Sequence, residues 1–329
     1  MSVFITRHVF SILIISLLGW CAVSSKSFTT IGIDALWASM AARIVNPPRV
    51  KVTSRFNKQR IVQLLEDGEF PGGVHLFDTI DSTNDWSLAE IKRGRVPPFI
   101  CLADHQSRGR GRRGRHWLSP SGANVYLSLV WHFELAAQQL GLLSLAQGVA
   151  VIRALRRIGI TDAWLKWPND VLIKSDKIAG VLIETSGIGS GSFNAVIGIG
   201  LNYRMPEKLA SESIVRWTDV VHAISGGVPD RNVVVAMLLT EVVKMCRLYQ
   251  HRASSLFDEL RRELAALSGR NVSVYTEAGD RVSGQVLGIS QTGELRVLVE
   301  GSERRFNSAD VSLAGPVGGS DEGAGHADD

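Results

Sequence analysis

The sequence lacks the residue groups that mark several common classes of protein. It has only three cysteines, Cys21, Cys101 and Cys246, which are far apart and show no metal-binding spacing. This usage fits a reducing compartment and excludes a disulfide framework. The formal net charge is only +4, so a basic footprint for nucleic acid over the whole surface is absent. There is also no Walker-type glycine–lysine loop, no serine–histidine–aspartate signature and no internal repeat.

The composition that is present is that of an ordinary globular protein. Hydrophobic residues make up 45% and charged residues 21% of the 329 residues, which excludes a disordered chain and a protein with many membrane spans. An apolar run, Val9–Ser25, resembles a signal peptide or a short membrane anchor. No A-x-A cleavage pattern follows the run, and we favour the interpretation that translation starts downstream, for example at Met40.

Hydrophobic periodicity predicts a mixed α+β domain followed by a small all-β module. From 271 to 313, short strands alternate with glycine turns, a pattern typical of an SH3-type barrel. The glycine-rich, acidic residues 316–329 indicate a disordered tail. The expected helices cover 56–65, 82–92, 139–158 and 233–264, the last broken near Ala253, and the expected strands cover 74–80, 99–103, 124–133, 163–173, 178–185 and 193–201.

Five arginines and three glycines alternate in Ser107–Trp117, SRGRGRRGRHW, which we call the Arg-Gly loop. Glycines let a backbone wrap closely around an anion, and arginines donate paired hydrogen bonds to phosphate and carboxylate groups. The loop lies between two predicted strands and is flanked by Gln106 and Trp117. We therefore expect a pocket for a phosphate-bearing ligand under a loop that is mobile when empty and ordered when filled. A solvated surface loop and an RNA-binding arginine–glycine tract remain as alternatives.

Three other stretches carry polar groups that suit a site, and each has a purely structural interpretation. Ser82–Asn84 begins a predicted helix and either caps it or binds the polar ring of a ligand. In Lys166–Asp170, KWPND, Pro168 keeps the preceding residue extended, so polar side chains gather at one point, or simply cap a turn. Lys177 opens an apolar strand and either extends to water or places its charge against a carboxylate.

In this order and spacing, the four motifs closely resemble those of the bacterial biotin–protein ligases. The most specific combination is GRGRRGRHW followed by SPSGANVYLSL, KWPND, KIAGVLIE and IGIGLN. The resemblance runs from about Phe56 to Leu313 and implies a catalytic domain related to class II aminoacyl-tRNA synthetases. It also implies a two-step reaction. Biotin and Mg-ATP give biotinyl-5′-AMP and pyrophosphate, and a lysine of a carrier protein then attacks the acyl-adenylate.

The resemblance assigns roles to residues of all four motifs. Arg112, Lys177 and Lys166 are the expected catalytic residues. Mg²⁺ is expected to enter with ATP, and Asp170 is the candidate protein ligand for it. The residues expected to bind biotin are Ser82, Thr83, Asn84, Gln106, Arg110, Gly111, Arg112 and Lys177. The residues expected to bind ATP are Arg110, Arg112, Arg113, Arg115, Trp117, Asn124, Lys166, Asn169, Asp170 and Asn202.

The resemblance also gives the expected domains and partners. Residues 1–55 would lie outside the catalytic core, 56–266 would form the catalytic domain, 267–314 the SH3-like domain and 315–329 the tail. The expected partner is the biotin carboxyl carrier protein of acetyl-CoA carboxylase, in the cytoplasm, where ATP chemistry belongs. A homodimer is compatible with the resemblance, and a membrane partner is not expected.

Two departures from the pattern bear on function. Bifunctional members carry an N-terminal winged helix-turn-helix that represses biotin genes, but residues 1–55 show no two-helix pattern with a polar reading face. DNA binding is therefore not expected. The nearest alternative enzyme is a lipoate–protein ligase, which shares the fold and the acyl-adenylate chemistry. The presence of both GRGRRGR and KWPND argues against it.

Overall fold

The computed structural model describes residues 55–65, 70, 72–135, 137–187, 189, 191–209, 216–251, 254–276 and 279–313. Our expectations for the apolar run, the start at Met40, a DNA-binding domain and the C-terminal tail lie outside these residues. All the elements below belong to one unit, residues 53–329. Cys101 and Cys246 are buried free thiols, and Cys21 is not among the described residues.

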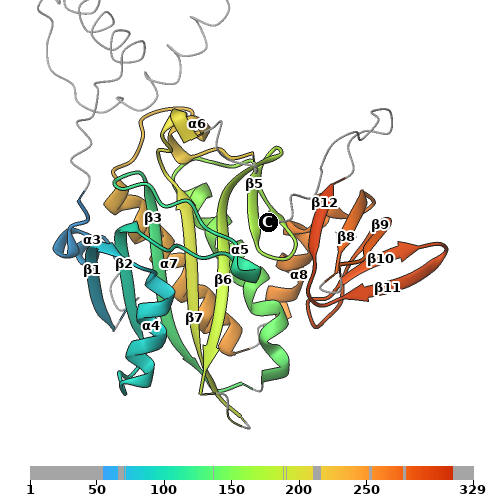
Figure 1. Cartoon of the computed structure of the whole chain (residues 1–329), viewed down its shortest axis with the longest axis horizontal. Helices are drawn as coiled ribbons and strands as arrows, with labels where there is room; N and C mark the ends of the chain where they lie inside the picture. The colour runs from blue at the N-terminus through green and yellow to red at the C-terminus, as the bar shows by residue number, and fades with distance from the viewer. Residues whose placement is uncertain are drawn as a thin grey trace, which may run out of the picture. The chain divides into compact units, whose positions relative to one another are not determined.

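A seven-stranded mixed sheet forms the centre of the main domain (Figure 1). The strand order is β1-β2-β3-β7-β6-β5-β4. The β1 and β2 strands run parallel, and every other neighbouring pair is antiparallel. The strands are β1 (Gly73–Ile80), β2 (Phe99–Gln106), β3 (Asn124–Phe133), β4 (Ala163–Lys166), β5 (Asp170–Ile173), β6 (Asp176–Ser186) and β7 (Phe193–Asn202).

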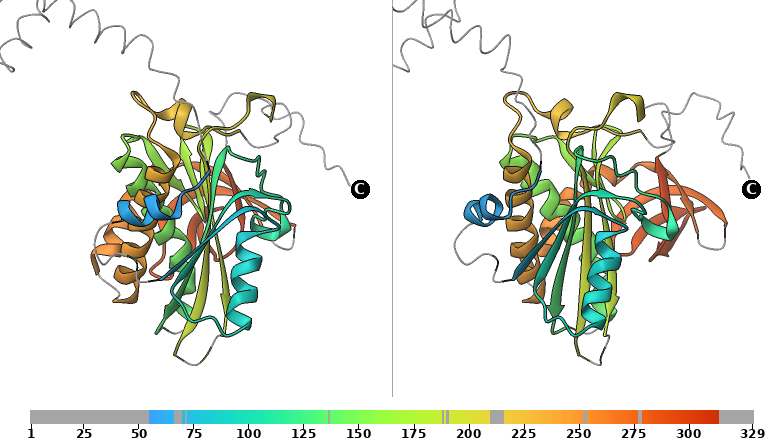
Figure 2. Two further views of the ribbon diagram at one scale, coloured as in Figure 1. Left: turned by 90° about the vertical axis from the view of Figure 1, so that its left-hand side faces the viewer. Right: turned by 60° about the vertical axis from the view of Figure 1, so that its left-hand side comes forward.

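Helices cover both faces of this sheet, as the apolar central strands require. On one face, Trp86, Leu88 and Ile91 of α4 (Thr83–Lys92) pack on residues of β2, β3 and β7. The other face carries α5 (Leu143–Arg157) and α7 (Arg231–Gln250) (Figure 2). No helix in the described part of the chain is long and apolar enough to cross a membrane. The shorter helices are α3 (Lys58–Leu64), α6 (Val220–Ala223), α8 (Ser254–Glu263), η1 (Arg112–Gly114), η2 (Ala137–Leu142), η3 (Glu207–Leu209) and η4 (Ala265–Leu267).

A second, five-stranded antiparallel sheet follows in the C-terminal part, in the order β11-β10-β9-β8-β12. Its alternating residues Leu295, Val297 and Val299 are buried, which confirms the expected small all-β module. The indole of Trp167 donates a 2.9 Å hydrogen bond to the carbonyl of Gly293, so this sheet is fixed to the KWPND turn. The strands are β8 (Asn271–Tyr275), β9 (Arg281–Ile289), β10 (Leu295–Val299), β11 (Ser302–Phe306) and β12 (Asp310–Leu313).

The α+β fold class is confirmed, but the segment 163–173 differs from its expected form. A single strand was expected there, and the structure has two antiparallel strands, β4 and β5, with the turn at residues 167–169. Pro168 has no amide hydrogen to donate to a neighbouring strand, so a continuous strand through it is disfavoured. The hairpin brings Lys166 opposite Asp170, which places both at the same edge of the sheet.

Candidate active site

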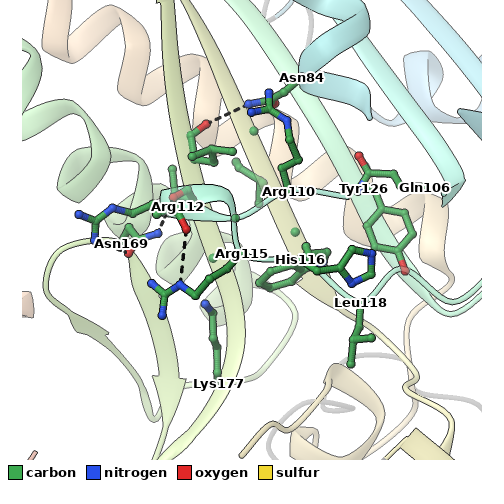
Figure 3. Close-up of a pocket in the computed structure, with 18 of the residues that line it drawn as sticks. Asn84, Gln106, Arg110, Arg112, Arg115, His116, Leu118, Tyr126, Asn169 and Lys177 are labelled. Atoms are coloured by element: carbon green, nitrogen blue, oxygen red, sulfur yellow. Dashed lines mark hydrogen bonds between the residues drawn. The ribbon is translucent and has the colours of Figure 1, made fainter. Parts of the chain in front are cut away.

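A cavity of about 550 Å³ lies where the Arg-Gly loop crosses the N-terminus of α4 and the strands β6 and β7 (Figure 3). This volume suits a small organic ligand. The cavity brings together all but three of the residues expected from the sequence. Those that line it are Ser82, Thr83, Asn84, Gln106, Arg110, Gly111, Arg112, Arg115, Trp117, Asn169, Asp170, Lys177 and Asn202.

One end of the cavity is a buried network of uncharged hydrogen-bonding groups. The amide and hydroxyl of Thr83 donate to Oε1 of Gln106 at 2.9 and 3.1 Å. The hydroxyl of Ser128 lies 2.6 Å from Oδ1 of Asn84 and 2.8 Å from the hydroxyl of Thr83. Ser82 caps α4 through the amide of Asp85. The cap and the site interpretations of this stretch are therefore compatible, because Ser82 makes the cap while its neighbours face the cavity.

Trp117 forms an apolar wall because two facing strands carry glycine. A Cβ on Gly200 would lie 2.4 Å from Cε2 of Trp117, so any larger residue there would displace the indole. On the neighbouring strand β6, a Cβ on Gly180 would lie 3.1 Å from Cζ3 of Trp117. The indole N–H of Trp117 is buried and meets no acceptor among the described residues. This leaves a hydrogen-bond donor for a ligand in the cavity.

Lys177 places an ammonium group against this wall. Its Nζ lies 2.5 Å from Oδ1 of Asp170 and 5.0 Å from the centre of the Trp117 ring. The backbone amide and carbonyl of Lys177 bond to Arg216 and Thr218 at 3.0 Å each. The backbone of Lys177 is therefore held on both sides, and its ammonium group is paired with the Asp170 carboxylate. The carboxylate of a ligand could take the place of Asp170 in this pair.

The Arg-Gly loop contacts the C-terminal sheet through three arginines. Arg112 donates to the carbonyl of Ala309 and the hydroxyl of Ser308, each at 3.3 Å. Arg113 and Arg115 reach Asp310 at 3.3 and 2.8 Å. Burial lowers the pKa of Arg112, with Asp310 opposing this effect and the charges of the other two arginines adding to it. The loop thus concentrates positive charge beside the cavity.

Arg110 differs from these arginines because two carboxylates of the main domain hold its guanidinium. Its Nη2 lies 2.5 Å from Asp85 and 2.9 Å from both carboxylate oxygens of Glu184. Burial acts to lower the pKa of Arg110, but the hydrogen bond and charge of Glu184, together with Asp85, raise it overall. The Arg110 side chain points toward α4 (Figure 3). The carboxylates of Asp85 and Glu184 balance its positive charge.

Three expected site residues do not line the cavity: Arg113, Asn124 and Lys166. Arg113 turns toward Asp310. Asn124 is fully buried behind the cavity, where it donates to Asn202 at 3.4 Å and accepts from the amide of Tyr203 at 3.0 Å. Burial lowers the pKa of Lys166, with Asp170 opposing this effect and Lys177 adding to it. Their roles in binding ATP stay predictions.

Several residues that line the cavity were not predicted as site residues, although the sequence pattern indicated some of them. A strand places every second residue on one face, so Gly180, Leu182, Gly198 and Gly200 follow from the KIAGVLIE and IGIGLN strands. His116 belongs to the Arg-Gly loop, and Tyr126 lies two residues after Asn124 on the same strand, so both also had a signal. Leu118 and Trp217 had none. The remaining missed lining residues are Val181, Ile199 and Met205.

The described residues contain no cluster of three or more His, Cys, Asp or Glu side chains that would hold a metal ion. Asp170 is the only acidic residue among the described residues that line the cavity. A divalent cation here would therefore depend on oxygen ligands from a bound nucleotide, as Mg²⁺ commonly does.

Comparisons with known proteins agree with this geometry. Residues 76–202 match the biotin/lipoate A/B protein ligase family, and residues 267–314 match the biotin protein ligase C terminal domain. The bifunctional ligase/repressor BirA of Escherichia coli K12 is 33% identical over 251 residues, which cover 75% of this chain and 76% of BirA. The biotin–[acetyl-CoA-carboxylase] ligase of Mycobacterium tuberculosis is 32% identical over 238 residues, which cover 70% of this chain and 85% of that protein.

A solved structure shows the same relationship. The biotin protein ligase from Aquifex aeolicus, in complex with biotin and ATP, superposes with a TM-score of 0.58 at 28% identity. The match covers 74% of this chain and 98% of that chain. With both sequence matches and the fold in agreement, the chain belongs to the biotin–protein ligase family.

Proposed function

We propose that the chain activates biotin with ATP to biotinyl-5′-AMP and transfers the biotinyl group to a lysine of a biotin carboxyl carrier protein. The observation that carries the proposal is the division of one cavity into two chemical ends. Uncharged donors and acceptors around Asn84 suit the ureido ring of biotin, and the loop arginines suit phosphates. Lys177 supplies the cation for the carboxylate that must react.

In the first step, a biotin carboxylate oxygen attacks the α-phosphorus of ATP. A carboxyl–phosphate bond forms, and the bond from that phosphorus to the bridging oxygen breaks, so pyrophosphate leaves with the electron pair. Charge grows on the leaving group, and fixed cations stabilise it most where water is excluded. Arg112 and Arg115 line the cavity and are proposed to supply this charge, together with Arg113 beside them. Mg²⁺ enters as part of the Mg-ATP substrate, with Asp170 as its proposed protein ligand.

In the second step, the carrier lysine attacks the acyl carbon as a neutral amine. The new amide bond forms, AMP leaves, and the amine loses a proton. The apolar wall of Trp117, Gly180 and Gly200 limits the access of water, which would otherwise hydrolyse the mixed anhydride. By analogy with the acetyl-CoA-carboxylase ligases among the relatives, we propose the carrier protein of that carboxylase as the acceptor and the cytoplasm as the place of reaction.

The assignment of residues follows the two ends of the cavity. Ser82, Thr83, Asn84 and Gln106 are proposed to hold the ureido end, and Arg110–Arg112 to lie along biotin and the adenylate. Trp117, Asn169 and Asn202 are proposed to contact the nucleotide. Asn124 and Lys166 lie outside the cavity lining. Asn124 is proposed to act through its hydrogen bond to Asn202, and Lys166 through its charge.

ATP–pyrophosphate exchange with biotin and with lipoate, measured side by side, tests the proposal. We expect exchange that depends on biotin and is absent with lipoate. Exchange with lipoate alone would make the chain a lipoate ligase. Absence of exchange with either substrate, combined with salt-sensitive RNA binding, would favour the RNA-binding interpretation of the Arg-Gly loop.

A further inference from the structure

Glu184 joins three elements at the end of the cavity that Thr83, Asn84 and Gln106 form, although it is not among the lining residues. Its Oε2 accepts from Nδ2 of Asn84 at 2.8 Å, and both of its oxygens accept from Nη2 of Arg110 at 2.9 Å. The side chain is 24% exposed. One carboxylate of β6 therefore holds both the N-terminus of α4 and the Arg-Gly loop.

This carboxylate decides which way the amide of Asn84 points. An ionised carboxylate accepts hydrogen bonds and cannot donate one, so Nδ2 of Asn84 has to face Glu184. A second, longer bond of 3.4 Å joins Nδ2 to the carbonyl of Leu182. On the other side, Oδ1 of Asn84 lies 2.6 Å from the hydroxyl of Ser128. One lone pair of Oδ1 remains for the N–H group of a ligand.

The same carboxylate keeps the Arg-Gly loop close to α4. Arg110 is shared between Glu184 and Asp85, and its side chain is 35% exposed. Asp85 contacts Arg110 but has no hydrogen bond to Asn84 among the described contacts. The two carboxylates therefore differ in function, because only Glu184 connects the loop to the amide of Asn84.

We propose that Glu184 is a positioning residue that selects ligands with ring N–H donors. It orients Asn84 with its oxygen toward the ligand, and through Arg110 it holds the loop over that end. This inference rests on the proposed function, since the ligand with ring N–H groups is the ureido ring of biotin. A ring without N–H groups, such as the dithiolane of lipoate, gains nothing from this arrangement.

Three substitutions separate the two roles. Glu184→Gln retains an acceptor for Asn84 but loses the negative charge that holds Arg110. Because the glutamine amide can also donate a hydrogen bond, it no longer forces Nδ2 of Asn84 to face it. Glu184→Ala removes both contacts. Asp85→Asn weakens only the Arg110 contact. The matched control is Glu303→Gln, which removes a carboxylate that also lies between two arginines, Arg296 and Arg305, in the C-terminal sheet.

The experiment measures KM for biotin and for ATP, and kcat, in pyrophosphate exchange by the full chain. Loss of a charge-assisted hydrogen bond corresponds to about a 10- to 100-fold change. We expect KM for biotin to rise about tenfold in Glu184→Gln and about a hundredfold in Glu184→Ala. KM for ATP should change less than about threefold. KM for biotin should rise by no more than about threefold in Asp85→Asn, which weakens the Arg110 contact but leaves Asn84 held by Glu184, and should stay at the wild-type value in Glu303→Gln.

The outcomes separate this inference from the proposed function. An active wild-type enzyme with an unchanged KM for biotin in Glu184→Gln, or with KM for ATP raised equally, overturns the role of Glu184 alone. Absence of biotin-dependent exchange in the wild-type chain overturns the proposed function. If Glu184→Ala unfolds, Glu184→Gln decides the question, because the amide has nearly the same shape as the carboxylate. Its thermal unfolding, compared with that of the control, shows whether it is folded.

Discussion

Removal of the Lys177 ammonium group tests the carboxylate-binding part of the site. Nζ lies 2.5 Å from Oδ1 of Asp170 and 5.0 Å from the Trp117 ring, with 22% of the side chain exposed. Loss of a charge-assisted partner in such a partly dry position costs about 2 to 3 kcal/mol, or on the order of a hundredfold in affinity. Lys177→Ala also leaves the Asp170 carboxylate unbalanced, and its repulsion of the ligand carboxylate adds at least about 1 kcal/mol.

This repulsion makes the prediction specific. The double variant Lys177→Ala/Asp170→Asn also removes the negative charge of Asp170. Its affinity for biotin should be at least about fivefold higher than that of Lys177→Ala. Isothermal titration with biotin, without ATP, measures both variants, and a separate titration with ATP serves as the control. Equal weakening of biotin and ATP by Lys177→Ala would refute the assignment of Lys177 to the biotin carboxylate. A double variant no better than the single one would refute the role given to Asp170.

Three further predictions follow from particular contacts. Gly200→Ala should displace Trp117, because Cε2 of the indole would lie 2.4 Å from the new Cβ. The free energy of unfolding, measured by urea denaturation, should fall by about 1 to 3 kcal/mol, and an unchanged midpoint would contradict the close packing. Burial lowers the pKa of Lys166 below its ordinary 10.5, so its charge is lost at a lower pH than that of an ordinary lysine. The value of kcat/KM for ATP should therefore fall as pH rises through this lowered pKa, and Lys166→Arg should move the fall to higher pH; identical profiles would exclude a role for this charge. Asp310→Asn removes the carboxylate shared by Arg113 and Arg115, so trypsin should cut the Arg-Gly loop faster in this variant than in the wild type. Biotin with Mg-ATP should slow cleavage of both proteins, and cleavage rates that the ligands leave unchanged would show that the loop does not close on the ligands.

Local sequence predicted the elements of the fold well where one pattern dominated. Leu145, Val149, Ile152 and Leu155 are all buried in α5, as expected for one face of the helix predicted at 139–158. Leu142 was expected on the same face, but it ends η2 just before α5 and is only partly buried. The break in the long C-terminal helical region falls between α7, which ends at Gln250, and α8, which begins at Ser254. A turn at KWPND was considered, but the hairpin was missed as an element because the apolar residues on both sides of Pro168 (Trp164 and Leu165 before it, 171–173 after it) were interpreted as one strand.

The motifs predicted most of the cavity lining, but contacts between distant elements were beyond the sequence. Glu184 and Ser128 meet Asn84 only because β3, β7 and β6 are neighbours in the sheet. Asp310 is 197 positions from Arg113, and no local pattern indicates that the C-terminal sheet contacts the Arg-Gly loop. Register and domain packing decide such pairs, and short-range periodicity carries no information about them.

Transfer of biotin to a carrier protein is the most direct test of the proposed activity. The measurement is the intact mass of a biotin carboxyl carrier domain after incubation with the chain, biotin and Mg-ATP. We expect one biotinyl group on one lysine, no product when ATP or biotin is left out, and no product when that lysine is replaced by arginine. An unmodified carrier domain under the complete conditions, or a lipoyl group added when lipoate replaces biotin, would contradict the account.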